Sequence, residues 1–167
     1  MEKVIYLAGG CFWGVERYYQ LLEGILDTEV GYANGNFANP TYEDLKAHRA
    51  SHVEAVKVVY DEEKIQLTQL LEHLFRIINP FTVDHQGGDY GHQYRTGIYY
   101  IEEEDKKIIQ EFITNEQRKY KQKIRVEVEK LNHFYKAEDY HQNYLKKNPF
   151  GYCHVDFSVI KKEERKK

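Results

Sequence analysis

Apolar and polar residues follow one another along the chain with two periods, one typical of strands and the other of helices. Residues 3–7 form an apolar, β-branched run of strand length. After a glycine-rich turn, apolar residues recur at helical spacing as far as Gly24. Similar patterns predict further strands at residues 27–32, 52–60, 97–101 and 125–129. Further helices are predicted at residues 62–79 and 102–122, with short helices at 41–45 and within 134–147.

This succession of elements predicts the fold class. Strand, helix, two strands, helix, strand, helix and strand are typical of an α+β domain with a mixed sheet and helices on one side. A chain of 167 residues can bury a sufficient core, and no repeat or linker divides it. We therefore expect one domain at residues 1–160, followed by a charged tail at 161–167 that frays.

Composition and charge exclude several classes of protein. Hydrophobic residues make up 41% and charged residues 31%, as in an ordinary soluble globule, and 15 tyrosines and 8 phenylalanines accompany a single methionine, Met1. The net charge of −3 gives no general attraction to nucleic acid, and no apolar run is long enough to span a membrane. No secretory signal follows Met1, so we expect a cytoplasmic protein in which a structural disulfide would be unusual.

Cys11 is the first candidate for chemistry. It lies among three glycines, near the only tryptophan, Trp13, at or next to the start of the first predicted helix. Unpaired backbone N–H groups and the helix dipole favour an anion there, so we expect this thiol to ionise more easily than a free one and to be reactive. The alternative is that Cys11 is a small buried hydrophobic residue, which is the usual environment of a cysteine.

Glu54 is the second candidate. In the predicted strand at 52–60 it shares one face with Val56, Val58 and Tyr60. Burial on that apolar face would raise the pKa of the carboxyl group and keep it protonated, which suits an acid beside a nucleophile. The alternative is that Glu54 lies at the strand end, solvated or ion-paired, and the pattern leaves both interpretations open.

The segment at residues 82–95 is polar, punctuated by glycines and rich in His, Asp and Tyr. Its histidines and aspartates could be metal ligands by type, but their spacing matches no familiar zinc pattern, and we expect no metal site. A loop that delivers Asp89 and Tyr94 as hydrogen-bonding groups is the preferred interpretation.

A longer pattern includes these candidates. Residues 10–14, GCFWG, resemble the signature of peptide methionine sulfoxide reductases of the A class. The similarity continues in the family's order at residues 31–33, 39–42, 52–56, 86–95, 140–142 and 148–153, and thus covers nearly the whole chain. Four residues stand where the family usually has Gly, Ala, Asn and Thr, and these are Ser51, Val53, Gly88 and His92. These departures could reshape the rim of a pocket, but none removes a reacting group.

The resemblance implies both a fold and a reaction. The fold would be a ferredoxin-like two-layer core with long loops and an extended C-terminal segment. The reaction would be the reduction of the S-epimer of methionine sulfoxide, in oxidised proteins and as the free amino acid, which repairs oxidative damage. No cofactor or metal is implied, and the external dithiol would be thioredoxin. We expect a monomer that binds neither nucleic acid nor membrane.

The resemblance also assigns roles to individual residues. The sulfur of a sulfoxide becomes electrophilic when its oxygen is protonated or strongly hydrogen-bonded, so the reaction needs a thiolate and an acid. Cys11 would be the nucleophile and become a sulfenic acid, and Glu54 would be the acid. The hydroxyls of Tyr42 and Tyr94 would hold the sulfoxide oxygen.

Further residues are implied in substrate binding. Phe12 and Trp13 would offer an apolar surface to the S-methyl group. Gly10, His52 and Asp89 are assigned to the binding site by the same resemblance. We expect Asp89 to order its loop or hold a water molecule rather than to touch sulfur.

Cys153 is the only other cysteine, and it is therefore the candidate to condense with the sulfenic acid as the resolving thiol. A Cys11–Cys153 disulfide requires the two Cα atoms to come within about 7 Å. Two alternatives remain. A thiol peroxidase or cysteine redox sensor would use the same two thiols. A non-catalytic binding module would use only the tyrosine-lined loops.

Overall fold

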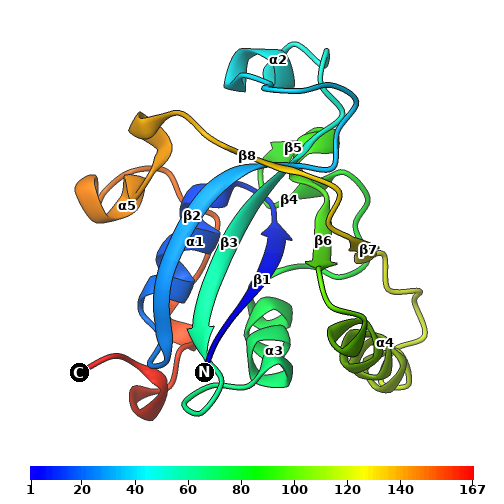
Figure 1. Ribbon diagram of the computed structural model, residues 1–167, viewed down its shortest axis with the longest axis vertical. Coiled ribbons are helices and arrows are strands. Elements are labelled where there is room, and N and C mark those ends of the chain that lie inside the picture. Colours follow the sequence, from blue (N-terminus) through cyan, green and yellow to red (C-terminus); the bar gives the residue numbers. More distant parts are fainter.

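The sheet of this protein has six strands in the order β7-β6-β1-β3-β2-β8, as shown by a computed structural model that describes residues 1–167 (Figure 1). The strands are β1 Glu2–Gly9, β2 Ile25–Ala33, β3 Val53–Asp61, β6 Thr96–Tyr100, β7 Glu127–Lys130 and β8 Phe134–Lys136. The helices are α1 Phe12–Gln20, α2 Tyr42–Lys46, α3 Leu67–Ile77, α4 Glu103–Gln117 and α5 Tyr144–Lys147. A separate hairpin pairs β4 His85–Gln86 with β5 Asp89–Tyr90.

The central part of the sheet has ferredoxin-like topology. The succession β1-α1-β2-β3-α3-β6 folds with the strand order β6-β1-β3-β2, in which all neighbours are antiparallel. The edges extend this unit, because β7 joins β6 in parallel and β8 joins β2 antiparallel. The prediction of a single α+β domain with a mixed sheet is confirmed. No helix of the chain is long and apolar enough to cross a membrane.

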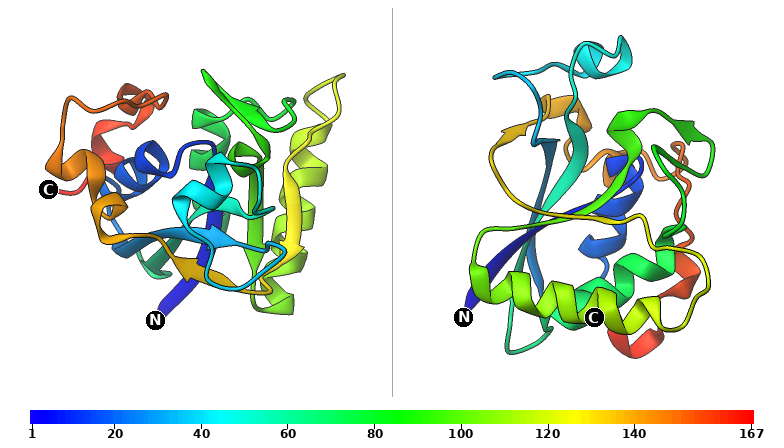
Figure 2. Two further views of the ribbon diagram at one scale, coloured as in Figure 1. Left: turned by 90° about the horizontal axis from the view of Figure 1, so that it is seen from above. Right: turned by 90° about the vertical axis from the view of Figure 1, so that its right-hand side faces the viewer.

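Helices α1, α3 and α4 pack on one face of the sheet, where the larger hydrophobic cluster lies (Figure 2). Val56 and Val58 of β3 face this cluster, and Val53 and Ala55 face a smaller cluster on the opposite side, which Leu131 and Phe134 cover. Alternation along a strand therefore turns the residue at position 54 toward the helices. Because position 54 faces the same side as Val56 and Val58, the carboxyl group of Glu54 lies between β3 and α1.

Tyrosine takes much of the core volume. Five tyrosines are almost completely buried, and these are Tyr18, Tyr19, Tyr32, Tyr60 and Tyr99. Four of their hydroxyls have hydrogen-bond partners, among them Tyr19, which donates to the Leu70 carbonyl at 2.8 Å, and Tyr99, which donates to Glu127 at 2.6 Å. No methionine takes part, because Met1 is 78% exposed at the N-terminus.

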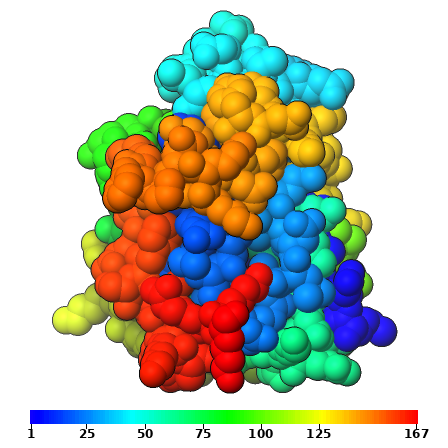
Figure 3. Space-filling view, turned by 90° about the vertical axis from the view of Figure 1, so that its left-hand side faces the viewer, coloured from blue at the N-terminus to red at the C-terminus, as the bar shows by residue number.

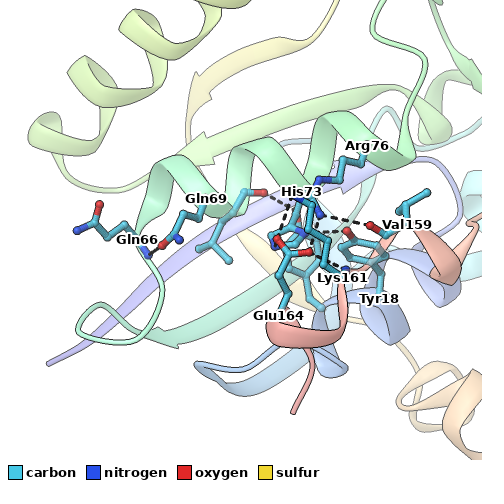
Figure 4. A network of polar contacts seen from close by, with 10 residues as sticks. Tyr18, Gln66, Gln69, His73, Arg76, Val159, Lys161 and Glu164 are labelled. Atoms are coloured by element: carbon cyan, nitrogen blue, oxygen red, sulfur yellow. Dashed lines mark hydrogen bonds and ion pairs between the residues drawn. The ribbon is translucent and has the colours of Figure 1, made fainter. Parts of the chain in front are cut away.

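The last residues of the chain are docked, which contradicts the expectation of a frayed tail at 161–167. Glu164 accepts two hydrogen bonds from the Arg76 guanidinium of α3, at 2.7 and 3.0 Å (Figure 4). The backbone N–H groups of Glu23 and Lys166 bond to the carbonyls of Glu164 and Leu21, at 2.8 and 2.9 Å. In the space-filling view the C-terminal segment wraps across α1 (Figure 3). A bidentate ion pair and backbone pairing hold these residues.

Several predicted boundaries also differ. The helix predicted at 62–79 begins only at Leu67, because residues 62–65 form a turn and the side-chain oxygen of Gln69 accepts the backbone N–H of Gln66 at the helix start, at 2.8 Å. The first helix ends at Gln20 rather than near Gly24. The short helix expected within 134–147 is only α5, since Phe134–Lys136 instead add strand β8 to the edge of the sheet.

Candidate active site

Cys11 stands at the N-terminus of α1, immediately after strand β1, as the sequence predicts. The turn between them depends on Gly10, whose φ of +90° disfavours other residues and whose added Cβ would lie 2.7 Å from Cβ of Gln86. Cys11 is 7% exposed, and its sulfur accepts a hydrogen bond from the backbone N–H of Trp13. The thiol is therefore largely shielded from solvent.

The expectation that Cys11 ionises easily is wrong for this arrangement. Burial raises the pKa of the Cys11 thiol well above its usual range, and the nearby Glu54 carboxyl group, once it is ionised at higher pH, adds to the shift. The hydrogen bond from Trp13 lowers the pKa but is the smaller effect. Desolvation thus outweighs the helix N-terminus, and the Cys11 thiol is neutral in this arrangement.

Glu54 is buried, which confirms the first of the two interpretations of its strand. Its side chain is 1% exposed, and Oε1 accepts the backbone N–H of Phe12 at 3.2 Å. Oε2 is buried and has no hydrogen-bond partner. Burial raises the pKa of this carboxyl group to about 8, against the smaller opposing effect of the Phe12 bond. Glu54 is therefore mostly protonated at neutral pH.

Two tyrosine hydroxyls face the same place from separate loops. Tyr42 begins α2, which Thr41 and Asp44 cap reciprocally, and Tyr94 lies in the 3₁₀ turn His92–Tyr94. Burial and the nearby Glu54 and Cys11 raise the pKa of Tyr42 to about 12, and the same groups raise that of Tyr94 further. The two hydroxyls also interact with each other. Both remain protonated and can donate hydrogen bonds.

Trp13 forms an apolar wall whose orientation is fixed on two sides. Its indole N–H donates to Nδ1 of His141 at 3.0 Å, and its ring stacks on Tyr144 with centroids 3.9 Å apart. Phe12 lies deeper, 1% exposed, with its ring near those of Tyr32 and His141. Only Trp13 presents partly exposed ring surface. His141 and Tyr144 were missed as site residues, although the motif at 140–142 could have drawn attention to His141.

Cys153 lies against the first turn of α1. A Cβ added to Gly14 would lie 2.8 Å from the sulfur of Cys153. The sulfur therefore fits there only because Gly14 has no side chain. Cys153 is half-buried, both cysteines are free thiols, and Cys153 is among the groups that raise the pKa of Cys11. The structure thus brings the two predicted thiols to the same helix turn.

Asp89 of β5 lies at the edge of this group. Its Oδ2 accepts the hydroxyl of Tyr152 at 3.0 Å, and its charge contributes to the raised pKa values of Glu54 and Cys11. The hairpin and the C-terminal segment are therefore tied together beside the thiols. This arrangement agrees with a role of Asp89 in ordering its loop.

His52 lies elsewhere. It is fully buried under Gly35, with its ring near those of Phe37, His133 and Tyr135. Neither ring nitrogen has a hydrogen-bond partner, and burial lowers the pKa of His52 to about 4. The structure gives His52 a packing role, and its assignment to substrate binding stays a prediction. No group of three or more His, Cys, Asp or Glu side chains gathers as metal ligands would.

The site combines a buried thiol, a protonated carboxyl group beside it, and a second thiol at the same helix turn. These groups are typical of an oxidoreductase that uses cysteine as its nucleophile. The sequence model of the family described as "Peptide methionine sulfoxide reductase" matches residues 3–167. This chain belongs to the peptide methionine sulfoxide reductase family and is an enzyme of that class.

Individual relatives agree over nearly the full length. The chain is 51% identical to the peptide methionine sulfoxide reductase MsrA of Lachnoclostridium phytofermentans, over 93% of both chains. It is 49% identical to that of Ureaplasma urealyticum, over 97% of this chain and 98% of the relative.

Solved structures of Mxr1 from Saccharomyces cerevisiae are also similar, at 38% identity. The reduced form superposes with a TM-score of 0.87 over 93% of this chain and 91% of that one. An "unusual oxidized form" gives a TM-score of 0.68 over 90% and 84%. Mxr1 in complex with Trx2 gives 0.61 over 86% and 84%, at 30% identity.

Proposed function

We propose that Cys11 attacks methionine S-sulfoxide while Glu54 gives a proton to the sulfoxide oxygen. The observation that carries this proposal is the position of Glu54, whose Oε1 is held by the N–H of the residue after Cys11 while Oε2 has no partner. A carboxyl group with a pKa of about 8 retains its proton at neutral pH and can donate it when charge develops on oxygen.

The number of protons in the site is conserved in this step. Glu54 donates its proton to oxygen, and the Cys11 thiol loses its own proton as its sulfur becomes nucleophilic. The substrate S–O bond breaks and an S–O bond to Cys11 forms, which leaves methionine and a Cys11 sulfenic acid. The thiol proton returns to the carboxylate, so Glu54 ends in the state in which it began. A neutral thiol with a raised pKa is compatible with this exchange.

Tyr42 and Tyr94 complete the site for oxygen. Their hydroxyls lie near both Cys11 and Glu54, and both stay protonated, so they can donate to the oxygen as its negative charge grows. Trp13, held by His141 and Tyr144, supports the S-methyl group on its exposed ring surface. A slot with these features holds the oxygen and the methyl group of the sulfoxide at different places, so it can select one epimer at sulfur, and the resemblance to the family makes that the S-epimer.

Cys153 acts as the resolving thiol in this proposal. Its sulfur attacks the sulfur of the Cys11 sulfenic acid, the S–S bond forms, the S–O bond breaks, and the hydroxyl leaves with the thiol proton as water. The position of Cys153 at Gly14 supports this role. The complex of the related Mxr1 with Trx2 supports a thioredoxin as the dithiol that then reduces the disulfide. The substrates are oxidised proteins, peptides and free methionine sulfoxide, and two free thiols suit the cytoplasm.

The test uses separated epimers of a methionine sulfoxide peptide with dithiothreitol as the reductant. Activity on the S-epimer alone, lost in C11S, is the expected result. C153S should release one methionine per enzyme and then stall with an oxidised Cys11 in the presence of thioredoxin. Continued thioredoxin-driven cycling of C153S would show that another group resolves the sulfenic acid.

The thiol peroxidase or redox sensor remains the second candidate, because it would use the same two cysteines. The Trp13 wall and the two tyrosine hydroxyls favour a substrate larger than peroxide. Rapid oxidation of Cys11 by hydrogen peroxide, with no turnover of either sulfoxide epimer, would favour the peroxidase over the reductase.

A further inference from the structure

The residue after Cys153 is inserted into the active-site turns. His154 has a side chain that is 6% exposed, and its Nε2–H donates to the backbone carbonyl of Gly9 at 2.8 Å. Gly9 is the last residue of β1, two positions before Cys11. This bond joins the C-terminal segment directly to the strand that presents the nucleophile.

The ring of His154 packs against Gly10 and Gly87, two glycines with left-handed backbone conformation, and we call this place the glycine seat. A Cβ added to Gly10, at a φ of +90°, would lie 3.0 Å from Cε1 and Nε2 of His154. A Cβ added to Gly87, at a φ of +57°, would lie 3.0 Å from Cβ of His154. Side chains at either position would push His154 out of its seat, so the glycines serve this contact as well as their turns.

The residue before Cys153 is held by the same loops. The hydroxyl of Tyr152 donates to Oδ2 of Asp89 at 3.0 Å, and Nδ1 of His154 lies 3.8 Å from the same oxygen. That nitrogen is buried and has no hydrogen-bond partner. Both neighbours of Cys153 therefore face Asp89, whereas the sulfur of Cys153 packs against Gly14 of α1.

We infer that His154 is a positioning residue for the resolving step, a latch that keeps the sulfur of Cys153 at the first turn of α1 through its bond to Gly9. The inference rests on the proposed role of Cys153 as the resolving thiol. In that step the S–S bond between Cys153 and Cys11 forms, the S–O bond of the sulfenic acid breaks, and water carries away the hydroxyl and the thiol proton. His154 takes no part in the bonds. It raises the fraction of time that the two sulfurs spend close together.

Two substitutions can separate the effect of the shape of the His154 ring from the effect of its hydrogen bond to Gly9. Burial lowers the pKa of His154, and the ring is therefore neutral with its proton on Nε2, where the Gly9 carbonyl accepts it. In H154Q the amide nitrogen can reach the position of Nε2 and donate the same bond. H154F keeps a ring of similar size in the glycine seat but cannot donate. The two variants differ in the one bond that the inference requires.

The experiment mixes reduced enzyme with excess S-sulfoxide peptide and no reductant. It follows methionine release by rapid quench, and loss of the sulfenic acid with disulfide formation by thiol trapping and mass spectrometry. We expect methionine release at the wild-type rate in H154Q and H154F. Disulfide formation should stay within about twofold of wild type in H154Q and fall about 3- to 10-fold in H154F, the effect expected of one buried hydrogen bond.

The outcomes separate this inference from the proposed function. An H154F protein that forms the disulfide at the wild-type rate, or faster, would overturn the latch. Equal slowing of methionine release and disulfide formation would also overturn it, because that result indicates general damage to the site. C153S, run beside them, should keep its sulfenic acid. If C153S loses the sulfenic acid at the wild-type rate, the resolving role of Cys153 fails instead. If H154F does not fold, H154A in the same assay gives the comparison with H154Q.

Discussion

The backbone N–H of Phe12 donates a hydrogen bond to Oε1 of Glu54 at 3.2 Å, across 42 positions of sequence. The proposed acid on β3 is thereby bound to the first turn of α1, one residue beyond the proposed nucleophile. The backbone pairing of Glu54 with Tyr32 between β3 and β2 fixes the strand position from which the carboxyl group extends.

Replacing Glu54 by Gln should lower the rate of methionine release about 10²- to 10⁴-fold, the usual contribution of a general acid. The substitution keeps the Phe12 bond and removes the proton. In the wild type, the same rate should fall as the pH rises above about 8, because the acid loses its proton in that range. Single-turnover kinetics over pH 6–10 provide the measurement. A rate of E54Q equal to that of wild type would remove Glu54 from the role of acid.

The same substitution should stabilise the folded enzyme. The folded pKa of Glu54, about 8, lies above the ordinary value of 4.5, so the carboxyl group ionises more easily in the unfolded chain. Stability due to this group is present below pH 4.5 and is lost as the pH rises toward 8. E54Q should exceed wild type by roughly 3 kcal/mol at pH 7, at 1.36 kcal/mol per pKa unit. Urea unfolding at pH 4 and pH 8 should show a gap only at the higher pH, and equal gaps at both would contradict the burial argument.

Removal of one hydroxyl from the oxygen site should slow methionine release. Y42F and Y94F are each expected to lose about 10²-fold in rate, as for one donor to a developing oxyanion. Tyr120 supplies a matched control, since it packs on Phe81 and is 40% exposed, and Y120F should behave as wild type. Rapid-quench assays on all three variants decide the point. Rates of Y42F and Y94F that match Y120F would mean that the hydroxyls do not touch the reacting oxygen.

A methyl group at Gly14 should separate the two chemical steps. In G14A the new Cβ would stand 2.8 Å from the Cys153 sulfur and 2.9 Å from Cγ2 of Val155, so the C-terminal segment must move away. Disulfide formation should slow severalfold while the first methionine is still released. Helix propensity favours alanine over glycine by about 1 kcal/mol, so a loss of helix stability would not explain the slowing. Counting free thiols after one turnover gives the readout. Unchanged disulfide formation would mean that Cys153 does not react from this position.

The docked tail should contribute to stability through Glu164. The bonds from Arg76 lower the pKa of Glu164 to about 2, so its stabilisation is present above pH 4.5 and is lost as the pH falls toward 2. Because the pair is partly exposed, E164Q should cost only about 1 kcal/mol at pH 7. Thermal unfolding of E164Q and wild type between pH 7 and pH 3 tests this, and the difference between them should shrink at acidic pH. A tail that contributes nothing would give identical curves at every pH.

The parts of the site that follow from local pattern could be predicted from the sequence. Strand, glycine turn and helix place Cys11, and the two-residue period of β3 turns Glu54 inward. The pKa of Cys11 could not be predicted in this way. A helix start is visible in the sequence, but the loops that bury the thiol come from distant segments, and their desolvation decides the direction of the shift.

Long-range partners account for the other failures. Arg76 and Glu164 are 88 positions apart, so a charged C-terminal stretch gave no sign that it would be docked. Strand β8 has only three residues and exists because β2 offers a free edge. The sequence gives no sign of a role for His154, because that role depends on its contacts with Gly10 and Gly87, which only the fold brings together.

The absence of methionine from the tyrosine-rich core has a consequence for survival under oxidants. Sulfoxide formation at a buried methionine puts a polar oxygen into close-packed apolar surroundings and loosens them. The side chains that fill this interior carry no thioether, and the one thioether of the chain sits in solvent at Met1. Conditions that generate the enzyme's substrate in other proteins therefore leave its own scaffold without a corresponding weak point.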